Sequence, residues 1–251
     1  MRQTEFEIRI MKNLGILLAI VVAGVVAYKW AYPSVSVRYR MTTVAELDGK
    51  QSSGSNVMEV TYYKNVRLLG ASADMQIGIR GEATSIDFGS RRLLAVLLAR
   101  GEHSRSDPEN IIPFAYGLTK GGIGPEYFPR IAELSGQREL PRELFPAVVF
   151  FRDSLDPTSV ELVNPPAPAG RSTAVPQLVS ITLEIIDTKT WTSGLPFVHI
   201  FTAEPTIRSI DQALPWLRDN SARLRFWKTL IAERYQPSGS TEIYTLFKME
   251  Q

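Results

Sequence analysis

The chain of 251 residues contains no cysteine and only two histidines, His103 and His199. Without cysteine it has no disulfide, no thiolate nucleophile, no cysteine-ligated zinc and no lipidated N-terminal cysteine. Two histidines that lie 96 positions apart exclude a histidine-rich metal site, although one histidine together with carboxylates remains a conceivable ligand set. We therefore expect no metal and no other cofactor.

The chain also has little net charge. The first 32 residues hold four basic and two acidic side chains, which leaves 24 of each sign in the rest of the chain. A nucleic-acid-binding protein needs clustered positive charge, because it must displace the counterions of the phosphates. The balanced composition predicts that the chain does not bind nucleic acid.

Catalytic motifs are missing as well, because the sequence has no nucleophile-elbow, zinc-protease, kinase or dinucleotide-binding pattern. The segment Glu102–Asp107 combines His103 with two serines and acidic residues. A catalytic triad is defined by geometry across the fold and not by neighbours in one loop, so a surface loop is the simpler interpretation. We assign no catalytic residue and favour a protein that is not an enzyme.

One polar turn could bind a small ligand or a hard cation. It runs between two predicted strands and contains Arg152, Asp153 and Asp156, the last followed by a proline. A calcium loop normally supplies more oxygen ligands than two carboxylates. Aspartate and proline also stabilise ordinary turns, so a structural role competes with the ligand-binding hypothesis.

An apolar segment lies near the N-terminus. Leu14–Tyr28 is 15 residues without a charge, and the hydrocarbon core of a bilayer requires about 20. Lys29 can snorkel to the interface, the aromatic residues after it favour that interface, and Pro33 ends the helix. This pattern predicts a transmembrane anchor over residues 14–32, with residues 1–13 in the cytoplasm and 33–251 as one extracytoplasmic β-rich domain.

A cleaved signal peptide is the alternative interpretation of the same segment. Met11–Asn13 resembles a compact positive start, and Val25–Ala27 places small residues at a cleavage position. Both interpretations put the domain outside the cytoplasm. Basic residues are equally frequent on the two flanks, so the orientation rests on the short N-terminal flank. We expect the cytoplasmic membrane, with the domain in the periplasm or another extracytoplasmic space.

Small residues recur on one face of this predicted helix. Gly15, Ala19, Ala23 and Ala27 follow each other at intervals of four. Such a stripe lets a second membrane helix approach closely. It predicts self-association or pairing with a partner helix, although glycine and alanine are also simply common in such segments.

The rest of the chain predicts strands more than helices. Val35–Leu47 and Asn56–Lys64 alternate apolar and polar residues, which indicates a hairpin with a long polar loop from Asp48 to Gly54. We expect a loop over Glu102–Asn110 because it is polar and contains a proline. Further expected strands are Met75–Arg80, Ala83–Phe88, Ala147–Arg152, Val160–Val163, Leu178–Ile186 and Thr241–Lys248, whereas Leu93–Leu98 fits a strand or a helix.

Helices are expected at Glu126–Leu134 and late in the chain, over Ser221–Tyr235. The late helix carries an apolar stripe of Leu224, Trp227, Leu230 and Ile231 beneath a basic face. Something must cover that stripe. The domain's own sheet is the economical answer, and a docking surface for a partner protein is the alternative.

A proline-rich stretch, residues 164–170, is the strongest linker-like segment. It could separate two subdomains or cross the edge of one sheet. The fold class that we expect is therefore α+β, with antiparallel sheet dominant, a few helices, one N-terminal transmembrane helix and a sub-boundary near 164–170.

Several segments resemble a family of small bacterial membrane-anchored envelope proteins of unknown function. The similar segments are Arg38–Thr42, Gly81–Ala83, Phe151–Val160, Ser180–Ile185 and Ala213–Leu217. The resemblance spans about Val35–Leu217 and implies an N-terminal membrane segment followed by a periplasmic domain. It implies no activity, cofactor or catalytic residue.

Two classes of function remain open at this point. The first is a non-enzymatic binding or assembly component of the cell envelope, anchored by one helix. The second is an anchored periplasmic hydrolase or small-ligand-binding protein that uses polar loops such as Arg152–Asp156. We favour the first, because no catalytic constellation stands out in the sequence.

Overall fold

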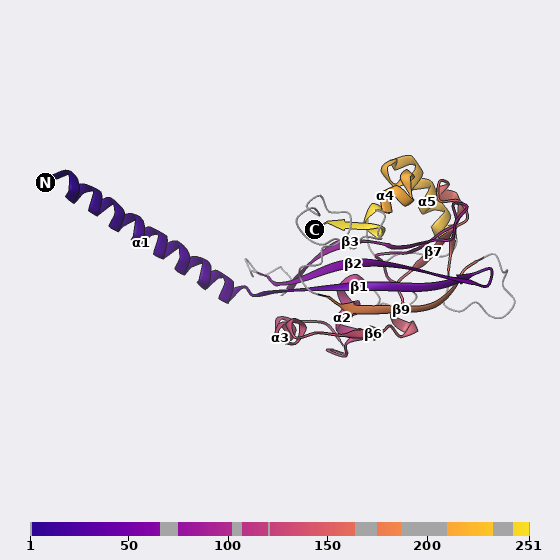
Figure 1. Cartoon of the computed structure of the whole chain (residues 1–251), viewed down its shortest axis with the longest axis horizontal. Helices are drawn as coiled ribbons and strands as arrows, with labels where there is room; N and C mark the ends of the chain where they lie inside the picture. Colours follow the sequence, from indigo (N-terminus) through magenta and orange to yellow (C-terminus); the bar gives the residue numbers. More distant parts are fainter. Residues whose placement is uncertain are drawn as a thin grey trace.

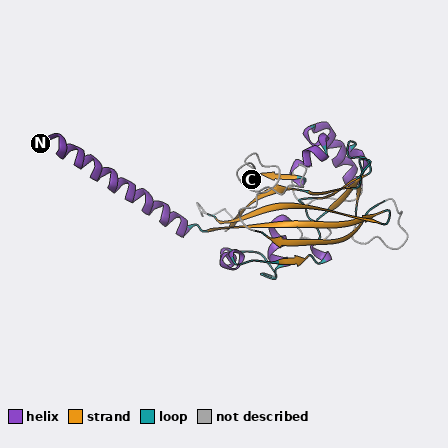
Figure 2. Cartoon of the chain, in the orientation of Figure 1, coloured by secondary structure: helices purple, strands orange, loops and turns teal. Residues whose placement is uncertain are grey.

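The computed structural model describes residues 2–65, 75–101, 107–119, 121–163, 175–186, 210–232 and 243–250 (Figure 1). Helix α1 (Arg2–Ala31) extends away from a β-rich domain that begins three residues later. In that domain the strands form two antiparallel sheets accompanied by short helices (Figure 2). The predicted α+β class, with antiparallel sheet dominant, is confirmed.

The large sheet has six strands in the order β10-β3-β2-β1-β9-β6, and every described pairing is antiparallel. Its strands are β1 (Ser34–Leu47), β2 (Lys50–Lys64), β3 (Met75–Glu82), β6 (Gln137–Glu139), β9 (Gln177–Ile185) and β10 (Lys248–Glu250). Two long strands, β1 and β2, form its centre. Buried and partly exposed residues alternate along β1, as expected for a sheet with one face against the core.

The small sheet has the order β4-β5-β7-β8 and is also antiparallel. Its strands are β4 (Thr84–Asp87), β5 (Leu93–Val96), β7 (Val148–Phe151) and β8 (Val160–Leu162). Only Ala83 separates β3 from β4, so the chain passes directly from the large sheet into the small one.

Short helices lie between and after the strands. The α-helices are α2 (Pro108–Ala115), α3 (Phe128–Ala132), α4 (Ile210–Ala213) and α5 (Asn220–Ala232). The 3-10 turns are η1 (Pro125–Tyr127), η2 (Arg142–Leu144), η3 (Pro157–Ser159), η4 (Pro215–Arg218) and η5 (Ile243–Leu246). In Figure 1, α4 and α5 lie on one side of the domain, and α3 and β6 on the other.

The small sheet is the central layer of the domain, because all residues of β5 and β7 are buried. Side chains alternate between the two faces of a strand. One face of this sheet, including Leu94 and Phe150, joins the cluster that contains Tyr39 of the large sheet. The opposite face, which includes Phe151, packs against α5 and its neighbours. Burial on both faces explains why these strands read as uninterrupted apolar runs.

The hairpin between β1 and β2 is tighter than predicted. A two-residue turn, Asp48–Gly49, replaces the expected long loop, and β2 already begins at Lys50. Both turn residues have positive φ, 55° and 74°, as in the hairpin turn that Asp-Gly sequences favour. The polar run after Gly49 therefore pairs with β1 although its composition is that of a loop.

Two further predictions are corrected. Asp107 and Pro108 begin helix α2 instead of continuing a loop, since proline is favoured in the first turn of a helix. Thr241–Lys248 is not one strand, because Ile243–Leu246 forms a 3-10 turn and the strand begins at Lys248. The ambiguous run Leu93–Leu98 is a strand over its first four residues.

Helix α5 buries a different face from the one we expected. Its buried residues are Ala222, Phe226 and Leu230, whereas Leu224 and Ile231 of the predicted stripe are 49% and 41% exposed. Trp227 is only partly buried. The helix covers the domain's own small sheet, but through a stripe centred on Phe226.

Aromatic rings hold this helical layer to the small sheet. Phe226 lies 5.3 Å from Trp216, 5.4 Å from Phe247 and 6.0 Å from Phe151, measured between ring centroids. These separations are those of favourable aromatic pairs. The ring of Phe226 on α5 is therefore the point where η4, the C-terminal segment and β7 meet this helix.

Some predictions concern residues outside the described part of the chain. These are the roles of His103 and His199 and the proline-rich stretch 164–170. The division of residues 33–251 into one domain or two stays a prediction.

We expect Phe226→Ala to lower the free energy of unfolding by about 3–5 kcal/mol, because it removes the ring at the centre of this cluster. The matched control is Leu224→Ala on the exposed side of the same helix, which should cost less than about 0.5 kcal/mol. Urea unfolding of the full chain in detergent, followed by near-ultraviolet circular dichroism, measures both. Equal losses for the two variants would contradict the assignment of the buried face.

Candidate functional site

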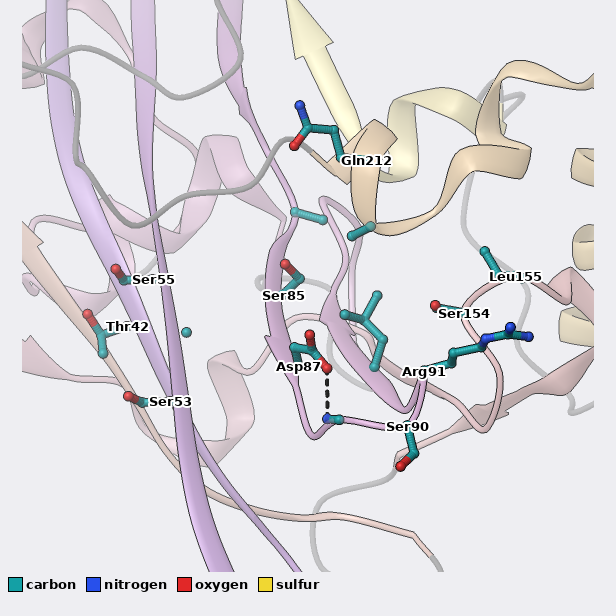
Figure 3. Close-up of a pocket in the computed structure, with 15 residues that line it drawn as sticks. Thr42, Ser53, Ser55, Ser85, Asp87, Ser90, Arg91, Ser154, Leu155 and Gln212 are labelled. Carbon is teal, nitrogen blue, oxygen red and sulfur yellow. Dashed lines mark hydrogen bonds between the residues drawn. The ribbon is translucent and has the colours of Figure 1, made fainter.

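A groove of about 740 Å³ lies where the hairpin end of the large sheet meets the small sheet (Figure 3). Strands β1 and β2 form one wall, and β4 with the turn after it forms the other. The loop after β7 and helix α4 complete the lining. The lining residues are Thr42, Ser53, Gly54, Ser55, Ala83, Ser85, Asp87, Gly89, Ser90, Arg91, Leu93, Ser154, Leu155, Gln212 and Ala213.

The groove forms because the two sheets meet at a glycine and then separate. A side chain at Gly54 of β2 would collide with the backbone carbonyl of Ser85 in β4. Only glycine allows the two backbones to approach this closely. Strand β3 pairs with β2 from Glu59 onward, so it does not fill the space beside the hairpin end.

Small hydroxyl side chains dominate the lining. Six of the 15 lining residues are serine or threonine, and Asp87 and Arg91 are the two that carry charge. The described residues of the lining include no histidine, lysine or aromatic residue. Asp87 accepts a hydrogen bond from the backbone N–H of Gly89 at 2.8 Å. The groove therefore offers many hydrogen-bonding groups, and its two charged side chains are of opposite sign.

The turn at the rim of the groove is held in an unfavourable conformation. Ser90 and Arg91 have φ values of 52° and 63°, and Gly89 before them has 79°. Non-glycine residues with positive φ cost about 1 kcal/mol or more each. The carbonyl of Arg91 accepts a hydrogen bond from the N–H of Ser154 at 2.8 Å, which ties this turn to the loop after β7.

The loop after β7, which we predicted as a ligand site, does border the groove, but the residues that line the groove are not the predicted ones. Ser154 and Leu155 line the groove, whereas Arg152, Asp153 and Asp156 do not. Arg152 pairs with Glu161 across the strands. The three predicted residues are therefore neighbours of the groove and not part of its wall.

The two aspartates of that loop stabilise its turns. Asp153 accepts from the N–H of Leu155 at 3.0 Å, and Asp156 accepts from the N–H and hydroxyl of Thr158 at 2.9 and 2.8 Å. The hydrogen bonds from Thr158 lower the pKa of Asp156 below its ordinary value. These bonds account for both aspartates without a ligand. Within the described ranges no three histidine or acidic side chains group as they would around a metal ion.

The other predicted sites lie elsewhere in the molecule. Gly15, Ala19, Ala23 and Ala27 share one exposed face of helix α1, where they line a shallow concave surface together with larger apolar residues. Pairing through that face stays a prediction. On α5, Leu230 is fully buried within the domain, so the predicted partner surface of Leu224, Trp227, Leu230 and Ile231 is not one continuous exposed patch.

A buried carboxylate lies next to the groove, at the passage between the sheets. Glu82 is 1% exposed, accepts a hydrogen bond from the N–H of Ile210 at 2.8 Å, and lies 3.3 Å from the ammonium of Lys248. Lys248 is also 3.7 Å from Asp211, which accepts from the hydroxyl of Tyr244 at 3.2 Å. The network joins β3, α4 and the C-terminal strand, so it fixes the position of Gln212 on the groove wall.

Sequence reasoning missed the groove because its lining comes from five separate stretches of the chain. One local signal was available: the run Ser52–Asn56 is unusually rich in small polar residues for a strand. The composition as far as Gly54 indicated a loop, and only the pairing with β1 shows that these residues belong to a strand.

Comparisons with protein-family models, with curated proteins and with solved structures find no match. The resemblance to envelope proteins therefore stays a prediction.

The environment of Glu82 predicts a specific dependence of stability on pH. Burial raises the pKa of Glu82 above its ordinary value, against the lowering effect of Ile210 and Lys248. A carboxyl group whose pKa is raised by folding stabilises the folded protein at pH values below its unfolded-state pKa. This stabilisation is lost as the pH rises through its folded-state pKa. We expect Glu82→Gln to gain stability relative to the unchanged chain as the pH is raised from 4 to 7.

The measurement is urea unfolding of both proteins across that pH range. Glu139→Gln on the exposed strand β6 is the matched control and should track the unchanged chain. A Glu82→Gln variant that loses stability relative to the unchanged chain with rising pH would mean that the ion pair with Lys248 outweighs burial.

Proposed function

We propose that this chain is a single-pass membrane-anchored protein whose β-rich domain lies outside the cytoplasm and acts as a non-enzymatic binding or assembly component of the cell envelope. The observation that carries the proposal is the apolar helix Asn13–Ala31. It spans 19 residues with a mean hydropathy of 2.1, and none of it is buried against the domain. Such a helix is compatible with a signal anchor or with a signal peptide.

The exposure of the apolar side chains of this helix favours a lipid environment. A core helix of a water-soluble domain would be covered by its neighbours, whereas Leu18, Val22 and Val26 are all exposed here. Leaving this much apolar surface in water is unfavourable by about 25 cal/mol per Å². Its length matches the roughly 20 residues that a helical span requires.

The connection to the domain determines which part of it lies near the bilayer. The helix ends at Ala31, and the carbonyl of Pro33 accepts a hydrogen bond from Lys64 at 3.1 Å, which ties the anchor to the open end of the central hairpin. Strands rise about 3.3 Å per residue, so Thr42 in the groove lies roughly 25 Å along β1 from the anchor. The hairpin end of β1 and β2 lies away from α1 (Figure 1), so the groove beside it is held away from the membrane surface, where a partner from the envelope can reach it.

The groove supports binding as the role of the domain. Hydroxyl residues from β1, β2 and β4 line it, together with Gln212 from α4 (Figure 3). Pockets of about 300–1,000 Å³ are typical of ligand sites. The strained turn at Ser90–Arg91 adds to this, since strain of this kind concentrates at functional sites.

We expect the protein to fractionate with membranes and to resist extraction by high salt and by alkaline carbonate, because the helix is held by lipid and not by charge. A variant with Leu18→Lys and Val22→Lys should move to the soluble fraction, since charges at the centre of a span are costly. A mature N-terminus at Tyr28 would overturn the anchor and support a cleaved signal peptide.

Single cysteines test the orientation, because the natural chain has none. A membrane-impermeant maleimide applied to intact spheroplasts should label Gln51→Cys at the exposed tip of the hairpin, and should not label Gln3→Cys. Detergent-permeabilised cells serve as the control in which both variants react. Labelling of Gln3→Cys alone would place the domain in the cytoplasm.

A further inference from the structure

The groove contains a strand edge that has no strand partner among the described residues. From Lys50 to Met58, β2 pairs with β1 on one side, and β3 reaches its other side only at Glu59. In an antiparallel pair, alternate residues direct their N–H and C=O groups toward the partner strand. Leu47 and Lys50 flank a two-residue turn and form a hydrogen-bonded pair, so Ser53 and Ser55 direct their backbone groups away from β1.

Both of these residues line the groove. An edge of this kind is a template for another strand, and proteins usually blunt it with lysine, proline or a bulge. Lys50 begins the strand at the turn, but Gln51–Ser55 beside the groove contains neither lysine nor proline, and its pairing with β1 has no register shift. The edge is therefore unprotected by sequence and is instead recessed beside β4 and α4 (Figure 3).

The walls of the groove fit an extended main chain better than a bulky ligand. Ser53 and Ser55 on the edge and Ala83 on the opposite wall are small, so a neighbouring backbone can approach closely on either side of the contact between Gly54 and Ser85. Among the described lining residues, none is aromatic and able to stack on a sugar ring or a base. Asp87 and Arg91 carry opposite charges, and Arg91 also pairs with Asp153 at 3.6 Å, so the groove favours neither a strongly acidic nor a strongly basic ligand.

We propose that the groove binds an extended, uncharged segment of a partner protein, which adds as a strand to the Gln51–Ser55 edge of β2. Backbone hydrogen bonds to Ser53 and Ser55 supply the binding, and the hydroxyls of the opposite wall contact the small side chains of the segment. This inference rests on the proposed role of the domain in binding, but it does not depend on which side of the membrane the domain occupies.

The test uses the full chain in nanodiscs and random 12-residue peptides displayed on phage. Peptides selected on the unchanged chain should bind Ser53→Pro about tenfold more weakly, because proline removes the outward N–H and places its ring on the edge. Folding should survive, since that N–H does not pair with β1 and proline is tolerated on strand edges. The matched control, Ser53→Ala, keeps the N–H and should bind the peptides as the unchanged chain does.

Modified peptides keep the test decisive if Ser53→Pro does not fold. N-methylation of one selected peptide at each position in turn should abolish binding at alternate residues only, because only every second residue faces the edge. A loss without this alternation overturns the proposal. Selected peptides that bind Ser53→Pro undiminished, or no enrichment of peptides at all, overturn it too.

Other occupants give distinct results. A ligand recognised through side-chain hydroxyls, such as a glycan, would be lost from Ser53→Ala as strongly as from Ser53→Pro. Disulfide-linked dimers of Ser53→Cys in nanodiscs would assign the edge to a second copy of the chain. Both results would overturn the proposal while leaving membrane anchoring, which extraction and cysteine labelling measure separately, unaffected.

Discussion

The small sheet must be covered on both faces, and this requirement places most other elements of the domain. Leu94 and Phe150 face the large sheet, while Leu93 and Phe151 face the helical layer. Exposing either face would leave several large side chains in water, at about 1.5–3 kcal/mol each. The long hairpin is therefore one cover, and α5 with the C-terminal segment is the other.

The groove owes its shape to the point where the chain passes from the large sheet into the small one. Glu82 closes β3, Ala83 bonds to Phe247, and β4 follows at once. The strand has to leave the large sheet here, because the small sheet packs beneath it and not beside it. A wedge then opens between β2 and β4 beyond their contact at Gly54. The groove is a geometric consequence of stacking two sheets that share a continuous chain.

Local patterns predicted the strands well where one face is solvated and poorly where composition and pairing disagree. Val35–Leu47 alternates and is a strand, and the apolar run Ala147–Arg152 contains one. The serine-rich start of β2 reads as a loop, because nothing local indicates that β1 supplies its hydrogen bonds. On α5, the choice between Leu224 and Phe226 as the buried side depended on the position of the small sheet. The lining of the groove required the whole topology.

Anchor and groove lie at opposite ends of the same two strands, and this arrangement restricts what the domain can engage. Strand β1 starts three residues after the apolar helix α1 and reaches the groove wall at Thr42, so a single hairpin joins them. A lipid headgroup would meet the open end of the hairpin first, near Pro33 and Lys64. A protein segment that extends from the envelope toward the membrane would reach the hairpin tip before the anchor. The edge of β2 that has no strand partner among the described residues lies next to that tip, so under the proposed anchoring a protein segment is a better match for the groove than the bilayer itself.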